Sequence, residues 1–145
     1  MKNILPKSAL ISLSDKTNLD LLVSFFLESS VEIISTGGTY KAIKEITNNV
    51  IEVSEYTGHK EMMGGRVKTL HPKIHAGILA RRGEDTDELK SMDYKEIDIV
   101  VVNLYPFEET IKSGCTFEEA IEQIDIGGPT MIRAAAKNFK DVLVL

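Results

Sequence analysis

The sequence predicts an α/β fold: a three-layer, doubly wound, mostly parallel sheet with helices on both faces. Short apolar or β-branched runs alternate along the chain with segments whose apolar residues recur at helical spacing. Such an alternation is typical of parallel strands joined by helices. Polar segments also follow three of the predicted strands directly, at 12–17, 35–39 and 103–106. Ligands of such folds bind beyond the carboxyl ends of the strands, so we expect these segments to carry the chemistry.

Composition describes a single domain of an ordinary soluble type. The 145 residues are 43% hydrophobic and 27% charged, which is enough to build one core. The only cysteine, Cys115, forbids an internal disulfide and fits a reducing compartment, so we expect a cytoplasmic protein. No apolar run reaches the about 18 residues of a membrane span, and the N-terminus lacks the order of a secretory signal. The net charge of −5 disfavours a nucleic-acid surface but not a local anion site.

The first half of the chain supplies three predicted strands and two helices. The strands share short apolar or β-branched runs and cover 8–14, 31–36 and 50–53. The helices share apolar residues at helical spacing and cover 18–29 and 39–46. Ser14 or Asp15 is the expected N-cap of the first helix.

The second half begins with 74–82, which is ambiguous between strand and helix, and 85–93, a polar helix or turn. The strongest strand lies within 97–107 and ends at Pro106. A helix at 116–124 opens with a capping-box pattern, and another at 127–139 has Pro129 near its first position. The final run, 141–145, has the pattern of a buried strand, and a chain ending there is expected to be part of a longer protein.

Two loops after strands have the pattern of a phosphate site. In "STGGT" (35–39), glycines let backbone N–H groups approach an anion, and a helix N-terminus follows. In "SLSDKT" (12–17), Lys16 follows hydroxyl side chains and could neutralise a phosphate. A tight turn without ligand, or a capped helix with a solvated lysine, would use the same residues. The candidate phosphate-binding residues are Ser14, Lys16, Thr17, Ser35, Thr36, Gly37, Gly38 and Thr39.

The stretch "MMGGRVKTLHP" (62–72) is the third candidate. Its two glycines permit a sharp bend, and Arg66 and Lys68 would share one face of an extended segment. Two converging cations require an anion between them, and a solvated charged loop is the alternative. His71 and His75 stand four apart, but Pro72 between them and the lack of an acidic partner disfavour a metal site, so we expect none.

Three further positions lie at the expected rim of the sheet. Tyr105 and Asn103 stand two apart at the end of the strongest strand. Asp125 lies between two isoleucines directly before Gly127-Gly128, where it could cap the next helix or serve as a base. Lys137 follows on the helix after these glycines.

Five motifs of this chain are "SLSDKT", "STGGT", "GGRVKTLHPKIHAGILAR", "NLYPF" and "EQIDIGGPTMIRAAAKN". Together they closely resemble the N-terminal inosine monophosphate (IMP) cyclohydrolase domain of bifunctional purine biosynthesis proteins. The resemblance covers nearly the whole chain, 1–145, and implies a methylglyoxal-synthase-like fold. It implies ring closure of 5-formamido-1-(5-phosphoribosyl)imidazole-4-carboxamide to IMP with loss of water. It implies no cofactor for this step, a separate formyltransferase domain using 10-formyltetrahydrofolate, and a homodimeric parent protein.

The resemblance also implies roles for particular residues. By this resemblance, the residues that correspond to the catalytic groups of the family are Lys68, Tyr105, Asp125 and Lys137. Asp125 would accept the carboxamide proton, Lys68 with Tyr105 would polarise the formyl oxygen, and Lys137 would assist proton return. The remaining substrate-binding residues outside the phosphate loops are Arg66, Thr69, Asn103, Gly127 and Gly128, with Arg66 and Asn103 supporting carbonyl oxygens.

Two features depart from that pattern. Phe139 stands where family members commonly carry histidine, so a polar role is lost there. A helix from Pro129 to Lys137 would rise about 12 Å, so Asp125 and Lys137 can share a small substrate only if the helix lies across it or ends early.

Two other functions use the same motifs. A non-catalytic phosphate-binding regulatory domain would keep "STGGT" but has no need for Lys68, Tyr105 and Asp125 together. Methylglyoxal synthase would require an acidic loop after a glycine pair, whereas Arg66 follows Gly65 here.

Overall fold

The computed structural model describes residues 5–145 and contains a five-stranded parallel sheet of order β3-β2-β1-β4-β5. This architecture confirms the predicted fold class. The strands are β1 (Ser8–Ser12), β2 (Glu32–Ser35), β3 (Ile51–Glu52), β4 (Ile99–Val102) and β5 (Leu143–Val144). The order changes direction at β1, which pairs with both β2 and β4, so the carboxyl ends of β1, β2 and β4 meet at one edge.

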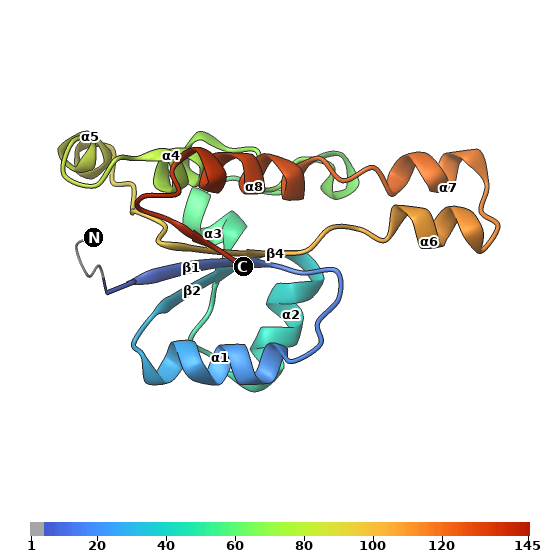
Figure 1. The fold of residues 1–145 in the computed structure, drawn as a ribbon, viewed down its shortest axis with the longest axis horizontal. Helices are drawn as coiled ribbons and strands as arrows, with labels where there is room; N and C mark the ends of the chain where they lie inside the picture. The colour runs from blue at the N-terminus through green and yellow to red at the C-terminus, as the bar shows by residue number, and fades with distance from the viewer. Residues whose placement is uncertain (1–4) are drawn as a thin grey trace.

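Helices cover both faces of the sheet (Figure 1). On one face lie α1 (Leu19–Glu28) and α2 (Gly37–Ile46). On the other lie α3 (Val53–Thr57), α4 (Pro72–Leu79) and α8 (Gly127–Lys137). Beside this second layer stand α5 (Thr86–Ser91) and a single 3₁₀ turn, η1 (Met63–Gly65).

The core has two parts because successive strand residues point to opposite faces. Leu10 of β1 packs in the cluster beneath α4 and α8, which also contains Ile74, Ile78 and Met131. Its neighbours Ala9 and Ile11 pack in the other cluster, with Val23 and Phe26 of α1. Both clusters are fully buried at the centre of β1, so this strand holds the loop that follows it rigidly.

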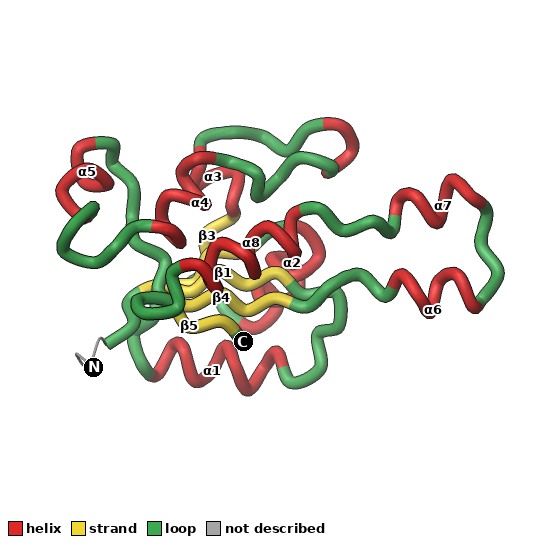
Figure 2. The backbone as a smooth tube through the Cα atoms, turned by 45° about the horizontal axis from the view of Figure 1, so that its top comes forward, coloured by secondary structure: helices red, strands yellow, loops and turns green. Residues whose placement is uncertain are grey.

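An arm of two short helices extends from the sheet edge. We use "the arm" for residues 107–122, which comprise α6 (Phe107–Lys112), a turn and α7 (Phe117–Glu122). Figures 1 and 2 show the arm projecting away from the sheet. Phe107, Ile111 and Phe117 are exposed on it. The predicted capping box of α7 is confirmed, since Thr116 and Glu119 exchange both hydrogen bonds.

Several predicted boundaries were wrong. The strand within 97–107 ends at Val102, where the side chain of Asn103 turns to the neighbouring loop, and α6 follows instead. The predicted third strand is only Ile51–Glu52, because α3 begins at Val53. The N-cap of α1 is Asn18 in the left-handed conformation, rather than Ser14 or Asp15.

The ambiguous segment 74–82 is mostly helix, within α4. The final run does form a parallel strand, but it lies at the sheet edge with Leu143 54% and Val144 39% exposed, so the expected burial was wrong. No helix within residues 5–145 combines the length and apolar character needed to cross a bilayer.

Candidate functional site

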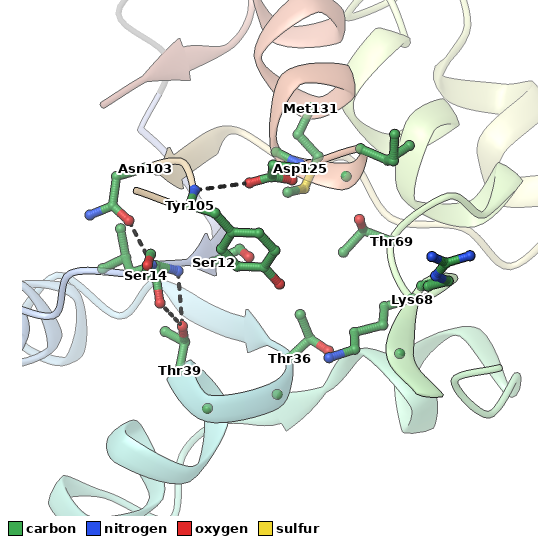
Figure 3. Close-up of a pocket in the computed structure, with 18 of the residues that line it drawn as sticks. Ser12, Ser14, Thr36, Thr39, Lys68, Thr69, Asn103, Tyr105, Asp125 and Met131 are labelled. Atoms are coloured by element: carbon green, nitrogen blue, oxygen red, sulfur yellow. Dashed lines mark hydrogen bonds between the residues drawn. The ribbon is translucent and has the colours of Figure 1, made fainter. Parts of the chain in front are cut away.

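A cavity of about 640 Å³ opens at the carboxyl edge of the sheet. Its volume lies in the range of small-molecule sites. Its walls come from the segments after β1, β2 and β4, from the loop that carries Lys68, from α7 and from the start of α8. Figure 3 shows the side chains from these separate segments facing a common space. We call this cavity the pocket.

The loop after β1 is fixed by Asn103. The Asn103 Oδ1 accepts hydrogen bonds from the backbone N–H groups of Ser14 (2.6 Å) and Asp15 (3.2 Å), and Nδ2 donates to the carbonyl of Asp15 at 2.8 Å. The side chain of Asn103 therefore holds the Ser14 loop against the end of β4. Thr17 completes the turn by donating from its backbone N–H and hydroxyl to Asp15, which lowers the pKa of that carboxyl.

Residues 35–39 lead from β2 into the N-terminus of α2, and we call them the cradle. The first N–H groups of an α-helix have no intrahelical acceptor, and Thr36, the extended N-cap residue of α2, makes no side-chain bond to them. A Cβ added to Gly38 would lie 3.8 Å from the Nζ of Lys16, and one added to Gly37 would lie 3.4 Å from the Nζ of Lys68. Two ammonium groups thus flank an open helix N-terminus, an arrangement suited to an anion.

Two hydroxyls predicted for this cradle have other partners. Thr39 is buried, donates to the carbonyl of Leu13 and accepts from its N–H, both at 2.9 Å. Ser35 is fully buried and donates to the carbonyl of Ile11 at 2.7 Å. These side chains tie β2 and α2 to β1. Thr39 still lines the pocket, whereas Ser35 and Thr17 do not.

The loop containing Lys68 is a tight hairpin, not the extended segment we expected. Met62 and Val67 exchange backbone hydrogen bonds at 3.1 and 3.3 Å, and Gly64 and Gly65 between them have positive φ. The hairpin sends its two cations to different partners. The Nζ of Lys68 lies 3.4 Å from the Oε2 of Glu61. Arg66 instead pairs with a residue of the arm, although both cations line the pocket.

Asp125 lies where the arm returns to α8. Its Oδ1 accepts from the N–H of Gly128 at 2.8 Å, and its Oδ2 lies 3.4 Å from the N–H of Tyr105. Asp125 therefore accepts from the first turn of α8, as the capping interpretation predicted, and it also lines the pocket. Figure 3 shows the ring of Tyr105 reaching into the pocket from beside Asp125, toward the side that carries Thr36 and Lys68.

Close packing explains both glycines at the start of α8. A Cβ at Gly127 would lie 2.6 Å from the Oγ1 of Thr69, which is buried, and one at Gly128 would lie 2.7 Å from the Oδ2 of Asp125. The two glycines bring α8 against Thr69 and Asp125 and so close the wall of the pocket.

The structure does not bring Lys137 to the pocket. α8 is continuous from Gly127 to Lys137, so its last residue stands about 15 Å from its first. Lys137 is exposed in the final turn, and Phe139 beyond it is exposed as well. Of the four catalytic residues expected, Lys68, Tyr105 and Asp125 share the pocket.

Sequence reasoning missed several pocket residues. Met131 lies one helical turn after Gly127 and Gly128, and this spacing could have identified it. Ile121 and Glu122 belong to the arm, whose placement over the pocket no sequence pattern indicated. Within residues 5–145 no group of three or more histidine, cysteine, aspartate or glutamate side chains is arranged to hold a metal ion.

The sheet order and the pocket define an α/β domain with a polar, cation-bearing cavity at the carboxyl edge of a parallel sheet. A family model for the MGS-like domain matches residues 19–130, and the chain belongs to this family. The chain also resembles a solved structure described as the crystal structure of ForH, with 33% sequence identity and a TM-score of 0.78. That match covers 97% of this chain and 74% of the other.

Proposed function

We propose that this domain is an IMP cyclohydrolase, which closes the purine ring of 5-formamido-1-(5-phosphoribosyl)imidazole-4-carboxamide with loss of water. One observation carries the proposal: Lys68, Tyr105 and Asp125 line the same pocket as the cradle at the start of α2. A site that only bound phosphate would need the cradle but not an acid, a phenol and a second ammonium group beside it.

The reaction explains why these groups are needed. A carboxamide nitrogen is a poor nucleophile and a formamide carbon is a poor electrophile. Ring closure therefore needs a base for the nitrogen, stabilisation of negative charge on the formyl oxygen, and a proton for the departing hydroxyl. Side chains can supply all three, so the proposed step uses no cofactor.

Asp125 is the proposed base. Its Oδ1 is held by Gly128, while its contact with Tyr105 through Oδ2 is long, at 3.4 Å, so Oδ2 keeps lone pairs for a substrate N–H. Lys68 and the hydroxyl of Tyr105 are proposed to stabilise the formyl oxygen and to protonate the leaving hydroxyl. Lys137 receives no substrate contact in this proposal, because it lies outside the pocket.

The phosphate is proposed to bind between Lys16 and the N-terminus of α2. Thr36, Gly37 and Gly38 offer backbone and hydroxyl donors, and Lys16 contributes charge. The amide of Asn103 is engaged with the Ser14 loop, so we assign it the positioning of that loop rather than a carbonyl of the substrate. Arg66 remains the candidate for a carbonyl oxygen.

The wider context is also a proposal. The chain would be the cyclohydrolase part of a bifunctional, cytoplasmic, homodimeric protein. A formyltransferase domain outside residues 1–145 would use 10-formyltetrahydrofolate to make the substrate of this domain.

The direct test is an ultraviolet assay of the purified chain with the formylated ribotide. We expect accumulation of IMP above the uncatalysed rate. Binding of IMP without turnover would favour the regulatory module, and conversion of a triose phosphate to methylglyoxal would favour the lyase. Either of these results would overturn the proposal.

A further inference from the structure

The arm contributes a charged residue to the pocket mouth. Glu122 contacts Arg66 through both carboxylate oxygens: the Nη2 of Arg66 bonds to Oε1, and its Nε lies 3.4 Å from Oε2. Both residues line the pocket. Each side chain is 59% exposed, and the hydrogen bond from Arg66 to Glu122, then the charge of Glu122, raise the pKa of Arg66. A planar guanidinium held at two points has a defined orientation, which a single contact would not give.

This pair is also the main polar link between the arm and the body. Among residues 5–145, it supplies the only hydrogen bonds or ion pairs that join the arm to a segment distant in sequence. The other side-chain bonds of the arm are local, such as the ion pair of Lys112 with Glu108. Figures 1 and 2 show that the arm otherwise extends away from the sheet and its helices.

We propose that Glu122 is a positioning residue, which holds the guanidinium of Arg66 at the pocket mouth so that it engages a carbonyl oxygen of the base of the bound nucleotide. The inference rests on the proposed function and deepens it. A guanidinium has five N–H donors. Glu122 engages two nitrogens of the Arg66 guanidinium, so other N–H donors of that guanidinium remain for a ligand. The arm reaches the pocket from β4 and α8, whereas the cradle follows β1 and β2, so Arg66 is assigned to the base and not to the phosphate.

The physical effect is preorganisation. A free arginine side chain must lose rotamer freedom when it binds a ligand, which corresponds to roughly a two- to twelvefold loss of affinity. Glu122 orders Arg66 before the ligand arrives and removes that cost. Exposed ion pairs contribute little to folding, so losing Glu122 should change binding much more than stability.

The test compares Glu122→Ala with Glu108→Ala, which removes a carboxylate from an exposed ion pair elsewhere on the arm. Calorimetric titrations would use IMP, which has a base with a carbonyl oxygen, and ribose 5-phosphate, which has no base. We expect Glu122→Ala to weaken IMP binding about three- to tenfold and to leave ribose 5-phosphate binding unchanged. Glu108→Ala should change neither.

A double-mutant cycle shows whether Glu122 acts through Arg66. We expect Arg66→Ala to weaken IMP binding, and the double variant Arg66→Ala with Glu122→Ala to bind IMP no more weakly than Arg66→Ala alone. In the cyclohydrolase assay, Glu122→Ala should raise KM for the ribotide and leave kcat nearly unchanged.

Two results would overturn the inference. Tighter binding of both ligands by Glu122→Ala would mean that Glu122 only repels anions. Unchanged IMP binding would mean that the pair is an ordinary surface contact. These failures are separable from failure of the proposed function, which would appear as wild-type protein that binds IMP but does not close the ring.

Discussion

The Nζ and Cε of Lys68 occupy the space that a side chain at Gly65 would need. A Cβ at Gly65 would lie 2.6 Å from the Cε and 2.9 Å from the Nζ of Lys68, and Gly65 has a φ of +94°. The glycine therefore does more than bend the hairpin, because its missing side chain lets the ammonium group lie across the backbone and face the cradle.

Gly65→Ala should displace Lys68 and reduce turnover about a hundredfold, the scale for losing an electrostatic stabiliser. Gly64→Ala is the matched control: Gly64 also has positive φ, but nothing lies within 4 Å of the added Cβ. Both variants should lose similar stability in thermal unfolding. Equal turnover in the two variants would show that backbone strain, and not displacement of the Lys68 ammonium group, causes the loss of turnover.

Asn103→Ala should weaken phosphate binding without removing any group that touches the phosphate. The variant releases three hydrogen bonds that hold Ser14 and Asp15, so Lys16 loses its fixed position. We expect faster amide exchange at residues 14–16 and weaker binding of ribose 5-phosphate, by about tenfold on the scale of one ordinary hydrogen bond. Slow exchange retained at these amides would contradict this role of Asn103.

Arg82→Ala should be severely destabilising. The side chain of Arg82 is largely buried and donates to Asp98 at 3.1 Å and to two backbone carbonyls. Its loss leaves the buried carboxylate of Asp98 without its cation and should cost about 3–5 kcal/mol in free energy of unfolding.

The neighbouring variant Arg81→Ala removes surface ion pairs with Glu84 and Asp85 and should destabilise the domain far less than Arg82→Ala. Denaturant unfolding of both variants gives the comparison. Equal losses would contradict the assignment of Arg82 as the buried partner of Asp98.

The stability of the domain should fall on acidification through the titration of His71. Its Nδ1 caps α4 by accepting from the N–H of Lys73 at 3.0 Å, and burial, then the charges of His59 and Lys73, lower its pKa. Burial lowers the pKa of His75 as well. Below the ordinary histidine pKa of about 6.5, the unfolded chain therefore binds more protons than the folded domain.

The stabilisation from neutral His71 and His75 is complete above the ordinary histidine pKa of about 6.5. It is lost as pH falls below that value and through their lowered pKa values. His71→Asn keeps a cap acceptor but cannot titrate, so its midpoint of unfolding should depend less on pH between about 7 and 5. The pH dependence of stability that remains in this variant is due partly to His75. An unchanged slope in His71→Asn would contradict the role of His71.

The sequence predicted the sheet and its ligand-binding edge well, because strand periodicity and the polar segments after strands are local signals. It predicted α7, but neither α6 nor the projection of the arm from the sheet. The six-residue helix α6 directly follows an apolar run that reads as more strand, and Leu104 and Tyr105 in that run are exposed. The apolar residues of β5 suggested that this strand would be buried. Its place at the sheet edge depends on strand order, which the sequence of one segment does not determine.

The same distinction applies to the site. Lys68, Tyr105 and Asp125 were found because each lies in a recognisable motif. The pairing of Arg66 with Glu122 joins residues 56 positions apart and depends on where the arm lies. Asn103 was assigned to substrate through the family resemblance, and Ser35 and Thr39 through the pattern of their loop. The side chains of all three make hydrogen bonds to the protein itself.

Asp125 is the proposed base of the reaction, and the variant Asp125→Asn removes that function alone. Asparagine keeps the shape of the side chain and an acceptor for the N–H of Gly128, but it cannot take the carboxamide proton. The measurement is kcat for ring closure together with the affinity for IMP, in wild type and variant. We predict that Asp125→Asn reduces kcat by about a hundredfold or more and leaves the affinity for IMP within about threefold. Wild-type kcat in Asp125→Asn would contradict the role of Asp125 as the base.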